Sequence, residues 1–515
     1  MFRSRPPFTV LLTAIVILLL LTPYRPAAQA DPFQGFDAFV EGVMKNWNVP
    51  GLAVGAVKDG KVVLAKGYGH RDVEKQLPVT SRTLMAIGSN SKSFTVTLMG
   101  MLSDDGKLDW DKPVRTYLPD FELHDDIATR LMTPTDLVTH RSGLPRHDGL
   151  WYVGGFSRKE MYERLRYLEP NASFRQRYQY NNLMFMTAGV LLERMTNQTW
   201  DDLIKQRIFT PLGMTRSNTS VRAMPASDDS SLPYMVRMGK TTEVPYRNLD
   251  AIAPAGSINS SIDDMLKYVQ MHIDEGVAGD KRLISKAFAA RMQSPHSAFS
   301  FSFDADAPVY TEMGPGGYGL GVSVRSYRGH KFVDHGGGID GFISTMSWMP
   351  HDRIGVVVLS NLSGINPVPN IVQLNVYERL LGLSLTDHVA RAKEGQLRTQ
   401  RQNMEREKKR QDERVTGTSP SRPLAQFAGS FEHPGYGLLT VAEKEGQLTV
   451  TRGIETTTLE HFHYDVFREA IGPSGARRMV TFTSGPSGKI ETLAIPLEPA
   501  VADIVFKRKP PTTGT

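Results

Sequence analysis

The sequence predicts an α+β protein with two folded parts, a sheet flanked by helices and a small all-β barrel, joined by a charged linker. Three observations carry this prediction. Strand-like segments occur early and again late between residues 51 and 361, with helical patterns between them, which predicts one sheet assembled from both ends of a domain with a helical region inserted. A highly charged stretch follows. Short alternating segments with glycine-rich turns then fill the C-terminal part, which is typical of a barrel.

The N-terminus has the layout of a secretory signal over residues 1–30. Arg3 and Arg5 precede an almost uninterrupted apolar run from Phe8 to Leu21, and Ala28-Gln29-Ala30 offers a small-x-small cleavage pattern. The run is shorter than the ~20 residues that cross a bilayer, so a retained anchor is the alternative to cleavage. We therefore expect an exported protein, periplasmic or secreted, with no stable membrane span after the signal is removed.

Charge and composition argue against several classes of protein. The 515-residue chain carries a formal charge of +6, and removing residues 1–30, with three arginines and no acid, leaves +6 − 3 = +3. The remaining excess lies largely near residue 400 and not on a face patterned with aromatic residues, so we expect no nucleic-acid partner. The absence of cysteine excludes disulfides, thiol catalysis and cysteine metal sites. We expect no cofactor and no metal.

The first folded part is predicted over residues 31–384. Asp59-Gly60 separates two β-rich runs in Gly51–Val63, which is a strong hairpin signal. After Ser89 the apolar residues recur at helical spacing, and residues 318–361 return to strands.

The rest of the chain divides into a linker and a second folded part. Residues 385–423 are highly charged and end in a Ser/Thr/Pro/Gly segment, which predicts a solvated helical or flexible tether. Residues 424–510 contain alternating runs such as GLLTVAEKEGQLTVTRG, which predict the barrel.

The segment GSNSKSFT places Ser89 and Lys92 three residues apart at the start of a predicted helix. Positions i and i+3 share a helix face, so Lys92 can point toward the Ser89 hydroxyl and accept its proton if the amine is neutral. The helix N-terminus also presents a free backbone N–H at Ser89 for an oxyanion. For an isolated S-x-x-K, a capped helix with a solvated lysine is the favoured explanation, so the neighbouring sequence has to decide.

Six further blocks follow in order, and with GSNSKSFT they resemble the serine β-lactamase and penicillin-binding-protein family. The similarity is to its class C branch, with CubicO-type peptidases, D-aminopeptidases and esterases, and it implies a β-lactamase/transpeptidase-like fold. The C-terminal part resembles the lipocalin-like barrel of some CubicO-type peptidases. The blocks are DDGKLDWDKPVRTYLPD, MTPTDLVTHRSGLP, the segment from YQYNN to PLGM, APAGSINSSIDDM, GYGLGV and VDHGGGIDGF.

The resemblance implies roles for residues downstream of the serine. The family's Y-x-N motif matches at Tyr180 and at Tyr246, and we choose Tyr180 because it opens the block ending in PLGM. Tyr180 is then the proton relay beside Ser89 and Lys92, and Asn182 offers an amide to the substrate. A tyrosinate base needs a charged lysine beside it, whereas a lysine base must be neutral. The sequence therefore leaves open which of the two is the base.

The family's third motif is K-T-G in β-lactamases, and His335-Gly336-Gly337 stands in its place. Glycine lets the strand approach a substrate closely, and the resemblance gives the Gly338 N–H the second oxyanion position. A largely neutral histidine lacks the permanent charge that lysine offers a carboxylate, so His335 is expected to offer the substrate only a hydrogen bond or a proton. Relatives with H-x-G are typically peptidases and esterases, so Gly337 and His335 favour these activities over β-lactam hydrolysis.

The resemblance therefore implies an exported serine hydrolase that acts through an acyl-enzyme on small peptides, including ones with D-residues, or on esters. A β-lactamase or D-Ala-D-Ala carboxypeptidase is the nearest alternative. A penicillin-binding sensor without turnover is the alternative from another class. The expected partner is a small-molecule or peptide substrate, and self-association through the C-terminal barrel is a further expectation.

Overall fold

The computed structural model describes residue 1 and residues 31–299, 310–470 and 477–510. The predicted signal over residues 1–30 therefore lies, apart from Met1, outside the described residues. Within the described ranges, no helix is both long enough and apolar enough to span a bilayer.

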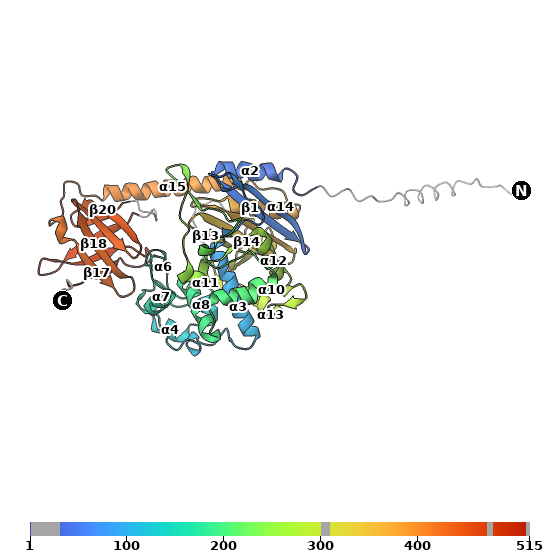
Figure 1. Cartoon of the computed structure of the whole chain (residues 1–515), viewed down its shortest axis with the longest axis horizontal. Helices are drawn as coiled ribbons and strands as arrows, with labels where there is room; N and C mark the ends of the chain where they lie inside the picture. The colour runs from blue at the N-terminus through green and yellow to red at the C-terminus, as the bar shows by residue number, and fades with distance from the viewer. Residues whose placement is uncertain (2–30, 300–309, 471–476, 511–515) are drawn as a thin grey trace.

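A nine-stranded antiparallel sheet forms the centre of the first folded part (Figure 1). Its strands are β1 (Gly51–Lys58), β2 (Lys61–Asp72), β3 (Leu77–Pro78), β10 (Ser297–Ala298), β11 (Gly317–Tyr318), β12 (Ser323–Tyr327), β13 (His330–Ile339), β14 (Phe342–Met349) and β15 (Ile354–Ser360).

The order of this sheet, β10-β11-β12-β13-β14-β15-β1-β2-β3, joins both ends of the domain. The early strand β1 pairs with the late strand β15, with Leu52 opposite Ser360. Asp59 and Gly60 both have positive φ, which is the backbone of the tight turn that the sequence predicts. The α+β prediction and the predicted assembly of the sheet are confirmed.

Helices cover both faces of the sheet. On one face, α2 (Phe36–Asn46) and α14 (Val368–Leu380) bury Val54 and Val356. On the other face, α12 (Ile262–Ile273) packs against β1 and β15. Because both faces are covered, the neighbouring strands β1 and β15 are nearly continuous apolar runs and do not alternate.

A helical region lies below the sheet in Figure 1 and includes α3, the helix that follows Ser89. Its helices are α3 (Ser91–Asp104), α4 (Asp126–Leu131), α5 (Pro134–Leu137), α6 (Gly149–Tyr152), α7 (Arg158–Arg164), α8 (Asn182–Thr196), α9 (Trp200–Ile204), α10 (Thr210–Leu212), α11 (Ala253–Gly256) and α13 (Lys286–Met292).

The long helix α15 (His388–Asp412) runs from the sheet to the barrel (Figure 1). Its charged sequence leaves only His388 buried. The indole N–H of Trp47 donates to Gln396 Oε1 (3.1 Å) and fixes the first half of the helix to the first folded part. Arg468 of the barrel donates to Glu407 (3.1 Å) in the second half. The helix is thus a solvated rod that is held near both ends.

The C-terminal strands close into a barrel in sequence order, which confirms the prediction from alternation. Leu439 and Val441 point inward, while the residue between them is exposed. The strands are β17 (Gly429–His433), β18 (Gly437–Lys444), β19 (Gln447–Arg452), β20 (Glu455–His463), β21 (Val466–Glu469), β22 (Met479–Ser484), β23 (Ile490–Ile495) and β24 (Ile504–Arg508).

The buried carboxylate of Glu378 anchors the start of α15. It accepts hydrogen bonds from Tyr327 Oη (2.8 Å) and from the Thr386 N–H (3.0 Å), and His388 Nε2 lies 3.2 Å away. Burial alone would raise its pKa, but hydrogen bonds from His388 and Thr386 outweigh burial and lower the pKa of Glu378 to about 2.

We expect Glu378→Gln to destabilise the first folded part by about 2 kcal/mol at pH 7, because charged hydrogen bonds to a buried group are lost. A carboxyl whose folded pKa is depressed stabilises fully above its unfolded value of 4.5. The wild-type advantage should therefore shrink as the pH falls from about 4.5 toward 2. Thermal unfolding as a function of pH measures this, with the exposed Glu394→Gln as the matched control. Equal melting temperatures for both variants would contradict the assignment.

Candidate active site

Ser89 lies in a single 3₁₀ turn, η1 (Gly88–Asn90), directly before α3 begins at Ser91. This turn packs against β13. A Cβ atom on Gly88 would lie 2.8 Å from the Gly338 nitrogen, and one on Gly337 would lie 1.9 Å from the Ile87 carbonyl oxygen. Only glycine fits at these two contacts, so the glycines bring the backbone at Ser89 and the backbone at Gly338 to the same pocket.

Lys92 is completely buried, and its Nζ lies 3.0 Å from Ser89 Oγ. The same nitrogen donates to Asn182 Oδ1 (2.7 Å) and to the Ala255 carbonyl (2.7 Å). Burial, reinforced by the positive charge of Arg146, lowers the pKa of Lys92 well below its usual value. A neutral amine has two N–H groups and one lone pair. Asn182 Oδ1 and the Ala255 carbonyl oxygen can only accept, so they take the two N–H groups. The lone pair is then free to accept the proton of the Ser89 hydroxyl.

Tyr180 completes the group, as the choice of the first Y-x-N match predicts. Its ring centroid lies 4.9 Å from Lys92 Nζ and 4.7 Å from the Arg146 guanidinium. Burial raises the pKa of Tyr180, although a hydrogen bond with Ser89 and the charge of Arg146 oppose the rise. The phenol therefore keeps its proton near neutral pH. Tyr246 lies elsewhere, with its hydroxyl donating to the Ser231 carbonyl (2.7 Å).

The segment that follows α5 contributes residues that the sequence analysis missed. The Asp148 carboxylate accepts hydrogen bonds from Asn182 Nδ2 (3.0 Å), Trp151 Nε1 (2.6 Å) and Arg146 Nε (2.5 Å). Both ends of the Asn182 amide are thus engaged, one by Lys92 and one by Asp148. RHDGLW matches no motif with a known spacing, so only its density of polar and aromatic residues could have drawn attention to it.

His335 lies beside the site but has no free ring nitrogen in this arrangement. Its Nε2 is 2.8 Å from the Tyr318 hydroxyl, and its Nδ1 is 2.6 Å from the Gly336 carbonyl oxygen. The carbonyl can only accept, so Nδ1 carries the proton and Nε2 accepts from Tyr318. Burial lowers the pKa of His335 to about 3. The ring is therefore neutral at ordinary pH and adds no permanent charge to the pocket.

The pocket at Ser89 has a volume of about 60 Å³. It combines a hydroxyl, an amide, a guanidinium and an indole with apolar walls. Its lining residues are Gly88, Ser89, Arg146, Trp151, Asn182, Leu249, Ile252, Ala255, Gly256, Gly338 and Ile339.

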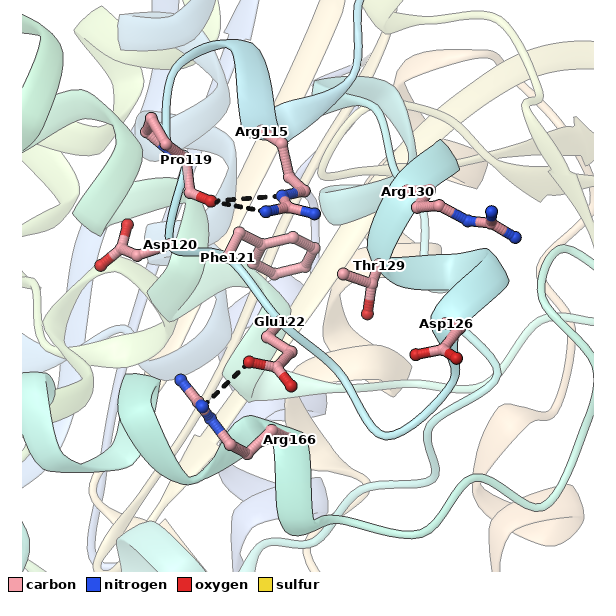
Figure 2. Close-up of a pocket in the computed structure, with 9 residues that line it drawn as sticks. All are labelled: Arg115, Pro119, Asp120, Phe121, Glu122, Asp126, Thr129, Arg130 and Arg166. Atoms are coloured by element: carbon pink, nitrogen blue, oxygen red, sulfur yellow. Dashed lines mark hydrogen bonds and ion pairs between the residues drawn. The ribbon is translucent and has the colours of Figure 1, made fainter.

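A larger pocket of about 420 Å³ lies in the helical region around α4 (Figure 2). Its lining has no serine, cysteine, histidine or lysine. Arg166 pairs with Glu122 (2.9 Å), and Arg115 donates to the Pro119 carbonyl (3.0 and 3.2 Å), so two of its three arginines are engaged by the pocket itself. The pocket at Ser89 is smaller, but it is the one of the two that holds a serine beside a buried lysine, so it is the candidate active site.

The barrel contacts the segment around the candidate active site through His147, next to Arg146 and Asp148. The His147 N–H donates to Glu498 Oε2 (2.6 Å), and its Nδ1 lies 2.7 Å from the Tyr436 hydroxyl. Its Nε2 lies 2.9 Å from the Glu169 carbonyl oxygen, so Nε2 carries the proton and Nδ1 accepts from Tyr436. His147 is buried and has a positive φ of 46°. Two barrel side chains thus hold a backbone conformation that costs energy.

We expect Tyr436→Phe to lower kcat/KM about tenfold, because it leaves a buried acceptor on His147 and loosens the segment that carries Arg146. The charge of Arg146 lowers the pKa of Lys92. A displaced Arg146 would no longer lower the pKa of Lys92, so that pKa should rise. The pH below which kcat/KM falls should then move to a higher value.

The matched control is Glu469→Gln, which breaks a buried ion pair with Arg452 inside the barrel (3.3 Å). It weakens the barrel without touching His147. Steady-state kinetics from pH 4 to 9 separate the two variants. An unmoved acidic limb in Tyr436→Phe, or the same shift in Glu469→Gln, would refute the role assigned to Tyr436.

The fold, together with a serine and a lysine three residues apart at the start of a buried helix, defines the β-lactamase and penicillin-binding-protein class. The family model Beta-lactamase matches residues 36–375, and the chain belongs to this family. A second model, Domain of unknown function (DUF3471), matches residues 413–508, which include the barrel.

Known proteins agree with this assignment. The chain is 29% identical over 514 residues to unguisins hydrolase ungD' of Aspergillus campestris, covering 92% of this chain and 91% of that one. It is 25% identical over 353 residues to protein flp of Staphylococcus aureus, covering 67% and 66% of the two chains. The octameric penicillin-binding protein homologue from Pyrococcus abyssi shares the fold, with a TM-score of 0.60, 23% identity, and coverage of 92% of this chain and 99% of that one.

Proposed function

We propose that the protein is an exported serine hydrolase that forms an acyl-enzyme on Ser89 and acts on small peptides or esters. One observation carries the proposal. A buried lysine with a lowered pKa lies 3.0 Å from the serine hydroxyl and has its two N–H groups taken by Asn182 and Ala255. This arrangement favours Lys92 over Tyr180 as the base, because a phenol with a raised pKa is a poor proton acceptor near neutral pH.

In this mechanism Lys92 takes the proton of Ser89 as the hydroxyl attacks the substrate carbonyl. The backbone N–H groups of Ser89 and Gly338 bind the oxyanion, and the contact between η1 and β13 supports this pairing. Tyr180 gives its phenolic proton to the leaving group and regains one from Lys92. Water then attacks the acyl-enzyme, and its proton passes to Tyr180 as Tyr180 gives a proton to Lys92. Lys92 returns a proton to Ser89 as the ester bond breaks.

The choice of substrate class rests on the charges around Ser89. A neutral His335 replaces the lysine that β-lactamases use for a carboxylate, and both of its nitrogens are bonded within the protein. That supports peptides and esters over β-lactams. A relative named as an unguisins hydrolase supports hydrolysis as the reaction. Export is supported by the arginines and apolar run within residues 1–30, and self-association through the barrel remains a prediction for light scattering to test.

The test is to detect the intermediate and the turnover together. Mixing the protein with p-nitrophenyl acetate and quenching in acid should give one added acetyl group, located by peptide mass spectrometry on Ser89, with continued release of nitrophenol. A panel of D- and L-aminoacyl anilides, peptides and nitrocefin then ranks substrates. A single burst without further turnover would indicate a binding protein, and rapid nitrocefin hydrolysis would indicate a β-lactamase.

A further inference from the structure

A second hollow, which we call the side groove, adjoins the pocket at Ser89 and has a volume of about 640 Å³. Three chain segments line both spaces. Trp151 belongs to both linings, Ile252 faces the pocket while Ala251 faces the groove, and Ile339 faces the pocket while Asp340 faces the groove. Because Trp151 and neighbouring residues of the same three segments line both spaces, the groove lies directly beside the pocket at Ser89.

A hydrogen-bond network fixes the shape of the side groove. Asp340 accepts from the Tyr152 hydroxyl (2.5 Å) and from Arg247 Nε (2.8 Å). The Arg247 guanidinium also lies over the Tyr152 ring, 4.2 Å from its centroid. These side chains come from the segments that border the catalytic pocket, so the groove and the pocket are held in one relative position.

The side groove has an amphipathic lining. Trp151, Tyr152, Phe156 and Tyr246 supply aromatic surface, and the barrel contributes Ile454, which is 70% exposed. Three arginines face two aspartates. Arg247 pairs with Asp340 and Arg222 with Asp250.

The third arginine, Arg237, is exposed at the end of β5 (Tyr234–Arg237). Among the described residues, no carboxylate lies within ion-pair distance of it. The groove therefore combines apolar walls with one uncompensated positive charge, a setting that suits an apolar chain ending in an anion.

We propose that the side groove binds the extended part of a peptide substrate, a chain of several residues that continues from the scissile carbonyl, with apolar side chains and an anionic end group directed to Arg237. This inference rests on the proposed hydrolase function and specifies its substrate. The barrel takes part in recognition through Ile454, whose N–H donates to the Val153 carbonyl (3.0 Å) and so holds the β19–β20 turn at the groove.

The test compares two p-nitrophenyl esters on the full-length protein, a short acetyl ester and a succinyl-tripeptide ester with phenylalanine. We expect the long ester to have a kcat/KM at least tenfold higher. Ile454→Asp and Arg237→Gln should each remove most of that advantage and leave the acetyl ester within twofold of wild type. Both positions are exposed, so the variants should fold.

Two matched controls accompany these variants. Tyr464→Asp changes an exposed aromatic residue in the turn after β20, at the opposite end of that strand from Ile454. Lys240→Gln removes the cation opposite Arg237 in the hairpin of β5 and β6 (Lys240–Glu243), outside the groove lining. Both should keep the preference for the long ester.

The outcomes separate the two proposals. Equal kcat/KM for the two esters, or equal losses in the controls, would overturn the proposal that the side groove binds the substrate. The proposed hydrolase function would still stand. Loss of the preference in only the two groove variants would support it. Failure to turn over even the acetyl ester would refute the hydrolase function itself, and the substrate assignment with it.

Discussion

Ser89→Ala is expected to lower kcat on p-nitrophenyl esters by about 10⁴-fold or more, because removing the nucleophile of a serine hydrolase leaves only binding and oxyanion stabilisation. The acetyl adduct should disappear from the same peptide. The hydroxyl is small and partly exposed in η1, so the fold should persist, and an unchanged melting temperature would show that it does.

The matched control for this variant is Ser103→Ala, near the end of the same helix α3. It should keep full activity. Turnover by Ser89→Ala that stays within tenfold of wild type would exclude Ser89 as the nucleophile.

Lys92→Met is expected to lower kcat/KM about 10²–10⁴-fold at pH 7–8, the range that a positioned base contributes. The wild-type profile should fall as the pH drops through the lowered pKa of Lys92, since the protonated amine cannot accept the serine proton. The variant should lose that acidic limb. Steady-state kinetics across pH measure both effects.

Lys92→Arg separates a base from a structural hydrogen-bond donor. A guanidinium can still donate to Asn182 and Ala255, but it stays protonated. If Lys92 is the base, the arginine variant should be about as inactive as Lys92→Met. Circular dichroism and thermal melts identify variants that fail to fold, and the exposed Lys107→Met is the matched control. A folded arginine variant that retains activity would contradict the assignment of the base.

The predictable parts of this protein are those set by local spacing. The i, i+3 relation puts Lys92 on the same side as Ser89, the Asp59-Gly60 turn fixes the first hairpin, and alternation in the C-terminal part builds the barrel. Each depends on a few neighbouring residues, and the order of the blocks then indicates the family fold.

The unpredicted parts depend on contacts between distant segments. His147 meets Tyr436 and Glu498 across about three hundred residues of chain, and no periodicity in the sequence encodes such a meeting. The protonation of Lys92 is likewise set by burial and by Arg146, which the S-x-x-K spacing does not contain. The sequence predicts that His335 offers the substrate a hydrogen bond or a proton, whereas in the structure Tyr318 and Gly336 engage both ring nitrogens.

The long helix α15 also fixes the orientation of the barrel relative to the sheet domain. Each residue in an α-helix advances the chain 1.5 Å and rotates it by about 100°, and this helix is held to the sheet domain by Gln396 and to the barrel by Glu407. One added residue would turn the barrel loops that carry Tyr436 and Ile454 away from the hydrolase domain. Seven would nearly restore the direction but move the barrel about 10 Å outward. The number of residues between Gln396 and Glu407 is therefore constrained by the position of the barrel, although almost every side chain along the helix faces water.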